Sequence, residues 1–176
     1  MIAISTLQAS SASVSPRKPV RLGTGILIVA SALGLHALVP LAHPLFGLLN
    51  LPMLVVVYMV MRQRATVVAM VGAMLVGWTQ DGLTRDPIGV LGIVYLLVAY
   101  LVSVASLYLK VSVGFVLGIF VATAYLLYEI LLFAVRHTLL GQEAAFDPWT
   151  WTAGTALHVG LALLVYPLLD RLARRP

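Results

Sequence analysis

The stretch WTQDGLTRDPIG, residues 78–89, places three charges between two apolar runs. Charges beside hydrocarbon are costly, so Asp81, Arg85 and Asp86 need partners or water. If the preceding helix continues through Asp81, Arg85 lies one turn further on, and the two side chains can form an interfacial ion pair. The alternative is that Asp81 is a polar anchor for the loop between two helices, or contacts another protein. The residue types leave both interpretations open.

A second carboxylate, that of Glu129, lies inside a long apolar run. An acidic residue costs about 2.5–3.5 kcal/mol at the centre of a membrane span and less towards its ends, so Glu129 is expected to face protein or water. Its candidate partners are Arg136, His158 and Tyr125. A proton or cation site is one functional hypothesis for Glu129, and this single carboxylate is its only support in the sequence.

Patterns for catalysis or metal binding are missing from the sequence. His36 and His158 are single histidines in apolar runs, and the chain has neither an HExxH pattern nor any cysteine. A metal site needs several such ligands, so each histidine is expected to form hydrogen bonds between helices instead. The serines lack the G-x-S-x-G setting of a nucleophile, and there is no glycine-rich phosphate loop. The sequence therefore predicts a non-enzymatic protein without a cofactor or metal.

Two aspartates directly precede prolines, at Asp86-Pro87 and Asp147-Pro148. Proline suits the first position of a helix, and an aspartate before it can accept hydrogen bonds from the free N–H groups of the first turn. The negative charge also suits the positive end of the helix dipole. Both pairs are therefore predicted to cap helices, the first starting at Pro87 and the second near Trp149.

The composition places these residues in a membrane protein. Of 176 residues, 61% are hydrophobic and only 10% are charged, whereas a soluble domain carries about 25% charged residues. An apolar run of about 20 residues crosses a bilayer as a helix, and the chain divides into six apolar runs. The expected fold is all-α with six transmembrane helices. The predicted spans are Leu22–Leu41, Leu45–Met61, Val67–Gln80, Pro87–Leu109, Val111–Val135 and Trp149–Leu169.

Lysine and arginine predict the orientation of the spans. Residues 1–21 are expected to form a flexible basic tail, residues 22–172 the six-helix domain, and residues 173–176 a basic tail end. Of the 11 lysine and arginine residues, only Arg85 and Arg136 fall in the predicted outer loops. This bias places both termini in the cytoplasm. It also accounts for the net charge of +5 without nucleic acid as a partner.

Small residues recur at four-residue intervals in two of the runs. Ala69, Ala73 and Gly77 form one such row, and Gly114 and Gly118 form a GxxxG pattern. Rows of this kind allow two helices to approach closely. Packing within the chain is one interpretation, and an interface with another chain is the other.

A pattern of glycine, acid and proline follows the short basic turn RQRAT, residues 62–66. Together with its apolar flanks, over residues 51–102, this pattern resembles the rod shape-determining protein family MreD. Trp78 departs mildly from the pattern, because family members usually carry a small or aliphatic residue there. The matching residues are Gly77, Gln80, Asp81, Leu83, Pro87, Ile88 and Gly89.

The resemblance implies a scaffold of the cell-elongation machinery in the bacterial cytoplasmic membrane. Its direct partner would be the single-span protein MreC, and MreB, RodA and the penicillin-binding transpeptidase would belong to the same complex, surrounded by membrane lipids. The MreD family is also similar in fold to the substrate-binding subunits of energy-coupling-factor vitamin transporters. The competing hypothesis is therefore a vitamin-binding subunit, with an outward-opening pocket lined by Tyr95, Tyr125, Tyr128, Trp149 and Trp151.

Overall fold

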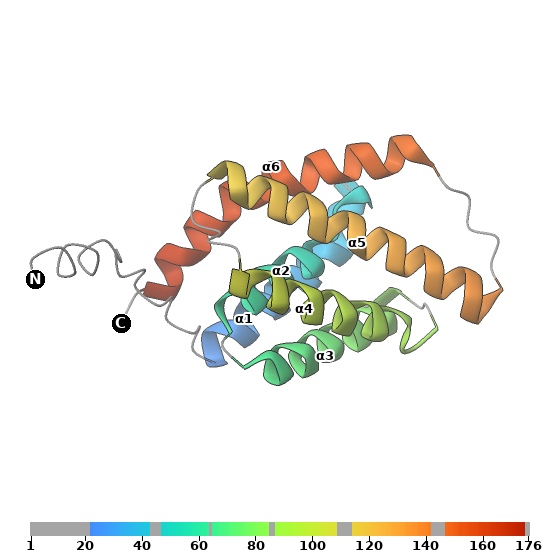
Figure 1. Ribbon diagram of the computed structural model, residues 1–176, viewed down its shortest axis with the longest axis horizontal. Coiled ribbons are helices and arrows are strands. Elements are labelled where there is room, and N and C mark those ends of the chain that lie inside the picture. Colours follow the sequence, from blue (N-terminus) through green and yellow to red (C-terminus); the bar gives the residue numbers. More distant parts are fainter. Residues whose placement is uncertain are drawn as a thin grey trace, which may run out of the picture.

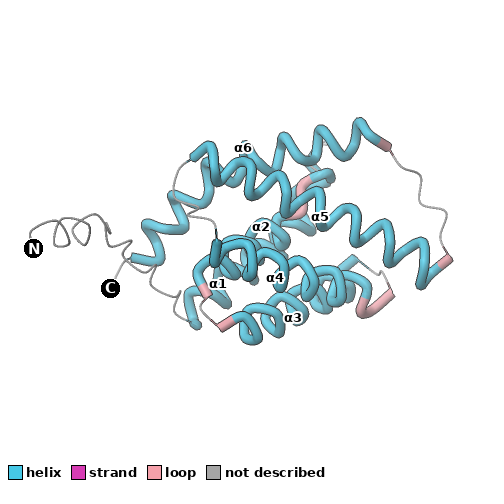
Figure 2. Tube along the Cα trace, in the orientation of Figure 1, coloured by secondary structure: helices cyan, strands magenta, loops and turns pink. Residues whose placement is uncertain are grey.

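A computed structural model describes residues 22–42, 47–63, 65–84, 87–108, 114–141 and 147–174 of the chain. These residues form six α-helices, and those outside the helices are confined to short segments (Figures 1 and 2). Within the described ranges no strand occurs, as expected for an all-α protein. The helices are α1 (Leu22–Ala42), α2 (Leu51–Arg62), α3 (Thr66–Thr84), α4 (Val90–Tyr108), α5 (Gly114–Leu140) and α6 (Pro148–Arg174).

Three of the helices are long and apolar enough to cross a membrane. They are α4, α5 and the part of α6 from Pro148 to Arg171. An α-helix rises about 1.5 Å per residue, and the hydrocarbon core of a bilayer is about 30 Å thick. Helices α1 and α2 also contain apolar segments, which are shorter.

Helix α2 differs from the predicted second span, because it starts at Leu51 rather than at Leu45. The side chain of Asn50 caps it by accepting a hydrogen bond from the Met53 N–H at 3.1 Å, and Pro52 occupies the first turn. Both features are typical of a helix start. With 12 residues, α2 is about 18 Å long and does not cross a bilayer by itself.

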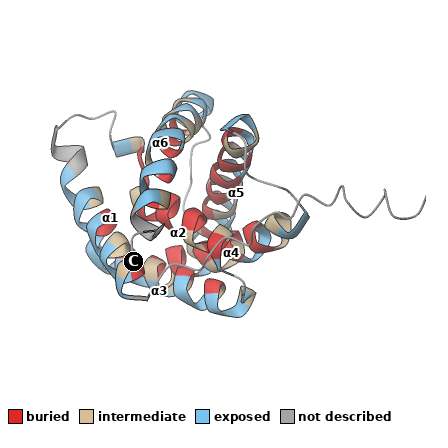
Figure 3. Ribbon diagram, turned by 90° about the vertical axis from the view of Figure 1, so that its left-hand side faces the viewer, coloured by how far each residue is buried: buried red, intermediate tan, exposed pale blue. Residues whose placement is uncertain are grey.

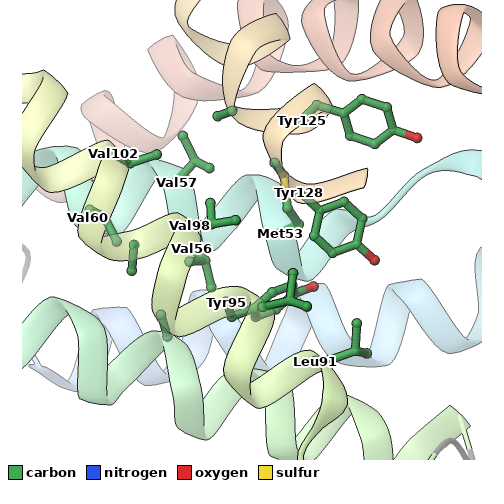
Figure 4. Packing of buried hydrophobic residues seen from close by; sticks show 14 of the residues in the cluster. Met53, Val56, Val57, Val60, Leu91, Tyr95, Val98, Val102, Tyr125 and Tyr128 are labelled. Carbon is green, nitrogen blue, oxygen red and sulfur yellow. The ribbon is translucent and has the colours of Figure 1, made fainter. Parts of the chain in front are cut away.

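This short helix lies at the centre of the bundle. It contacts each of the other five helices, and a view from the end of the bundle shows α2 near the middle of the group (Figure 3). Met53 and Val57 are fully buried. The valines of α2 and α4 pack against one another in the main core cluster (Figure 4). A helix buried on every side must be apolar all round, and α2 is, apart from its two ends.

The start of α6 is capped as predicted. The carboxylate of Asp147 accepts hydrogen bonds from the Trp149 N–H at 3.1 Å and from the Thr150 hydroxyl. The bond from the Thr150 hydroxyl stabilises the charged carboxylate and lowers the pKa of Asp147. The cap is exposed to solvent.

Candidate functional site

Asp81 joins the end of α3 to the start of α4. Its carboxylate is fully buried and accepts a hydrogen bond from the Gly89 N–H at 2.8 Å and another from the Leu91 N–H at 3.1 Å. The Leu91 N–H belongs to the first turn of α4 and the Gly89 N–H lies directly before it, where the positive end of the helix dipole also favours a negative charge. Asp81 is therefore the polar anchor between the two helices, and it caps a helix to which it does not belong.

The predicted cap at Asp86-Pro87 needs correction. Helix α4 starts at Val90, so Pro87 lies before the helix and is not its first residue. Arg85 and Asp86 lie outside the described residues, so the proposed ion pair between Asp81 and Arg85 and the cap by Asp86 are not described. The sequence argument assigned the cap to the nearest aspartate, whereas the described one comes from the preceding helix.

Glycines bring α3 and α4 into backbone contact. A Cβ atom on Gly77 would lie 2.5 Å from the Leu91 carbonyl oxygen, which leaves no room for a side chain. In return, the ring of Trp78 lies where a Cβ atom of Gly92 would be. Gly89 has a φ of +108°, which residues with a side chain rarely adopt. We call these contacts, together with the cap by Asp81, the interlock; its residues are Gly77, Trp78, Asp81, Gly89, Leu91 and Gly92.

A buried polar network extends from the interlock into the core, with Asn50 at its centre. The Asn50 side chain donates from Nδ2 to the Tyr128 hydroxyl at 2.9 Å and accepts at Oδ1 from the Tyr95 hydroxyl at 2.9 Å. Its backbone N–H donates to Nε2 of His158 at 3.0 Å. One residue at the start of α2 therefore connects α4, α5 and α6. Hydrogen-bonding the polar groups in this way removes the cost of burying them.

Gln80 extends the network to α1. Its Oε1 lies 2.5 Å from the Tyr95 hydroxyl oxygen, whose single hydrogen it shares with Asn50 Oδ1, and its Nε2 lies 3.1 Å from Nε2 of His36. The other ring nitrogen of His36 lies 3.1 Å from the Leu49 carbonyl oxygen. A carbonyl oxygen only accepts, so the neutral ring carries its hydrogen on Nδ1 and accepts the Gln80 hydrogen at Nε2.

His158 forms the interhelical hydrogen bond that the sequence predicts for it. Its Nδ1 donates to the Gly154 carbonyl oxygen at 2.7 Å, so Nε2 is the acceptor for Asn50. The ring is fully buried and stacks on Tyr125, with 4.0 Å between the ring centroids. Gly154 leaves room for the Tyr125 hydroxyl. Both ring nitrogens are engaged as hydrogen-bonding groups rather than as metal ligands.

Glu129 lies apart from this network. It is half-buried on α5, is hydrogen-bonded to Tyr125 one turn earlier and interacts electrostatically with Arg136. Two of its three candidate partners are therefore neighbours on its own helix. Among the described residues, no group of three or more histidine and acidic side chains could hold a metal ion.

The GxxxG pattern of α5 faces α6. A Cβ atom on Gly118 would lie 3.4 Å from the Val159 side chain, and one on Gly114 would lie 4.0 Å from Leu163. Gly114 and Gly118 thus serve packing within the chain. Of the other row, Gly77 belongs to the interlock, and Ala69 and Ala73 are core residues.

A second polar cluster, at the opposite end of the bundle, was missed by the sequence argument. Nη1 of Arg62 lies 2.5 Å from Oδ1 of Asp170, which also accepts a hydrogen bond from the Tyr58 hydroxyl at 2.8 Å. The Arg62 guanidinium lies 5.6 Å from the centre of the Tyr58 ring. The sequence does contain a signal for this cluster. Asp170 is the only acidic residue in the segments predicted to face the cytoplasm, and all other charged residues there are basic.

Both clusters hold helices together and present no nucleophile beside a base. No family model, curated protein or solved structure matches this chain. The polar side chains of the network bond chiefly to one another and to the backbone. The geometry of the site therefore suits fixing the positions of helices, and in the interlock the backbones of two helices are in contact.

Proposed function

We propose that this chain is a non-enzymatic scaffold of the bacterial cell-elongation machinery, as the resemblance to MreD implies. The observation that carries the proposal is the interlock. Gly77 allows the backbone contact, Asp81 caps α4, and Gly89 supplies the turn conformation. Four of the seven residues that resemble the family pattern thus have structural roles, which suits a protein that positions partners; they are Gly77, Gln80, Asp81 and Gly89.

The partner in this proposal is MreC, bound directly, with RodA, the penicillin-binding transpeptidase and MreB in the same complex. The test is co-purification of the tagged chain with MreC from the same organism, after co-expression and detergent extraction. We expect a stable complex that withstands washing. An unrelated single-span protein, expressed to the same level, is the control for contact through the detergent micelle. Absence of a complex when both proteins are well expressed would contradict the proposal.

We further propose that the six helices lie in the cytoplasmic membrane with both termini in the cytoplasm. Helix α1 starts and α6 ends at the same end of the bundle (Figure 1). Arg62 and Arg171 also belong to the helix ends predicted to face the cytoplasm. A reporter fused after Arg175 should behave as cytoplasmic, and one inserted at Gln142 as periplasmic. The reverse pattern would contradict this orientation.

The positions of the aromatic residues favour the scaffold over the vitamin-binding subunit. Tyr95, Tyr125 and Tyr128 are buried in the core, with at most 5% of their surface exposed, and Trp149 is 76% exposed. Tyr95 and Tyr128 bond to Asn50. The three tyrosines thus contact other parts of the protein, whereas a vitamin pocket would need their side chains to line an opening. Tight binding of a vitamin to the purified chain would reverse this preference.

A further inference from the structure

An apolar groove of about 780 Å³ lies between α1 and α6. Helix α1 packs chiefly on α2 and α3, and α6 packs chiefly on α5, so residues of α2 form the floor between them. The walls are almost entirely aliphatic. Three hydroxyl-bearing residues line the groove, and one of them, Tyr166, donates to the Leu54 carbonyl oxygen at 2.8 Å.

The other two hydroxyls in the groove have no hydrogen-bond partner within the described part of the chain. They belong to Thr24 and Ser31, which are seven residues apart and so lie on the same face of α1. Several other threonines on helices bond to a carbonyl of the preceding turn, as Thr79 does to Leu75 at 2.8 Å, although the buried Ser103 hydroxyl on α4 has no partner among the described residues. In an apolar environment an unpaired hydroxyl is unfavourable, so these two positions favour an occupant that offers polar groups.

The depth of Ser31 distinguishes the possible occupants. It lies nine residues after Leu22, where α1 begins, and is therefore about 14 Å along the helix. In a hydrocarbon layer of about 30 Å, this is near the middle. Lipid chains have no hydrogen-bonding groups at that depth. A membrane-spanning helix of another protein offers hydroxyls and backbone carbonyls there, and small or hydroxyl-bearing residues are common where such helices pack together.

We propose that the groove between α1 and α6 is the docking surface for one membrane-spanning helix of a partner protein. Small or polar residues of that helix, two turns apart, would face Thr24 and Ser31, while its larger aliphatic residues would fill the groove. The inference rests on the proposed scaffold function, and the partner helix would then be the single span of MreC.

Cysteine cross-linking tests this directly, because the chain contains no cysteine of its own. Ser31→Cys is co-expressed with MreC variants, freed of native cysteines, that carry one cysteine at successive positions of the span. A disulfide requires Cβ atoms about 3.5–4.5 Å apart. We expect cross-links at positions of the span repeating every three to four residues. Ile130→Cys, on the exposed face of α5, is the matched control and should give none.

A filling substitution provides a second measurement. Ser31→Trp should reduce the recovery of MreC at least ten-fold, whereas Ile130→Trp should leave it unchanged. If MreC co-purifies but cross-links to Ile130→Cys and not to Ser31→Cys, the groove assignment is wrong and the scaffold proposal stands. If MreC does not co-purify with the wild-type chain, both are wrong. Disulfide-linked pairs of this chain alone, or a phospholipid retained in the groove that Ser31→Trp displaces without loss of MreC, would also overturn the assignment.

Discussion

Replacing Asp81 removes the acceptor that two N–H groups of α4 share. In Asp81→Ala, the Gly89 and Leu91 N–H groups lose their partner. A buried donor left unpaired costs about 1–3 kcal/mol. Leu91 is 3% exposed, whereas Gly89 is half-buried and can reach water. We therefore expect a loss of about 2–4 kcal/mol in the free energy of unfolding, below the two-donor maximum of about 6.

Asp81→Asn separates the charge from the size of the side chain. One oxygen remains as an acceptor, while the amide nitrogen faces an N–H group and cannot accept from it. One of the two bonds is lost and the other is no longer charge-assisted, so about 1–3 kcal/mol of stability should be lost. Under the scaffold proposal, cells that depend on this variant should also lose their rod shape at normal protein levels.

The assay is unfolding in detergent micelles with increasing SDS, followed by tryptophan fluorescence, because Trp78 packs on the first turn of α4. Asp147→Asn is the matched control. Its carboxylate also caps a helix but is exposed, and asparagine caps about as well as aspartate, so its midpoint should equal that of the wild type. A wild-type midpoint for Asp81→Asn would refute the argument that the buried charge is needed.

Two further substitutions test the packing and the second polar cluster. Gly77→Ala places a Cβ atom against the α4 backbone and should cost about 1–3 kcal/mol of stability by overpacking. The control is Gly72→Ala on the same helix, which has free space and should be neutral or stabilising. Equal unfolding midpoints of the two variants in the SDS titration would contradict the close contact at Gly77. Arg62→Gln leaves the Asp170 carboxylate without its ion pair, and because that side chain is 34% exposed we expect a loss of about 1–2 kcal/mol, below the range for fully buried pairs. Adding Asp170→Asn should then cost little more, and fully additive losses would show that the two residues are not coupled.

Local patterns in the sequence predict the helices and the cap by Asp147. Apolar runs give six helices, and Asp147 caps α6 from the adjacent position, where its donors, the Trp149 N–H and the Thr150 hydroxyl, lie two and three residues on. The Asn50-Leu51-Pro52 pattern was an equally local signal for the start of α2. Hydropathy alone hides this signal, because the apolar run Leu45–Met61 begins before the helix does.

Contacts between distant residues could not be predicted in the same way. Asp81 reaches donors eight and ten residues later, across a turn whose geometry the sequence does not determine. The partners of Asn50 outside α2 range from 30 to 108 residues away. Such pairs depend on which helices are neighbours in space and on how far each helix is shifted along its axis relative to its neighbours. Hydropathy predicts that a helix forms but not what it faces.

The central position of α2 has a consequence for biosynthesis. Twelve residues are too few for a segment to partition into the bilayer on its own, so in the proposed membrane arrangement α2 would enter together with its neighbours. The last acceptor for its cap, His158, is synthesised 108 residues after Asn50. Until α6 has been inserted, the Asn50 N–H at the amino end of α2 therefore lacks its acceptor, although the Asn50 side chain can already bond to Tyr95 and Tyr128. A ribosome that stalls before α6 would leave a nascent chain with this end exposed, a feature that membrane proteases and insertion chaperones can recognise.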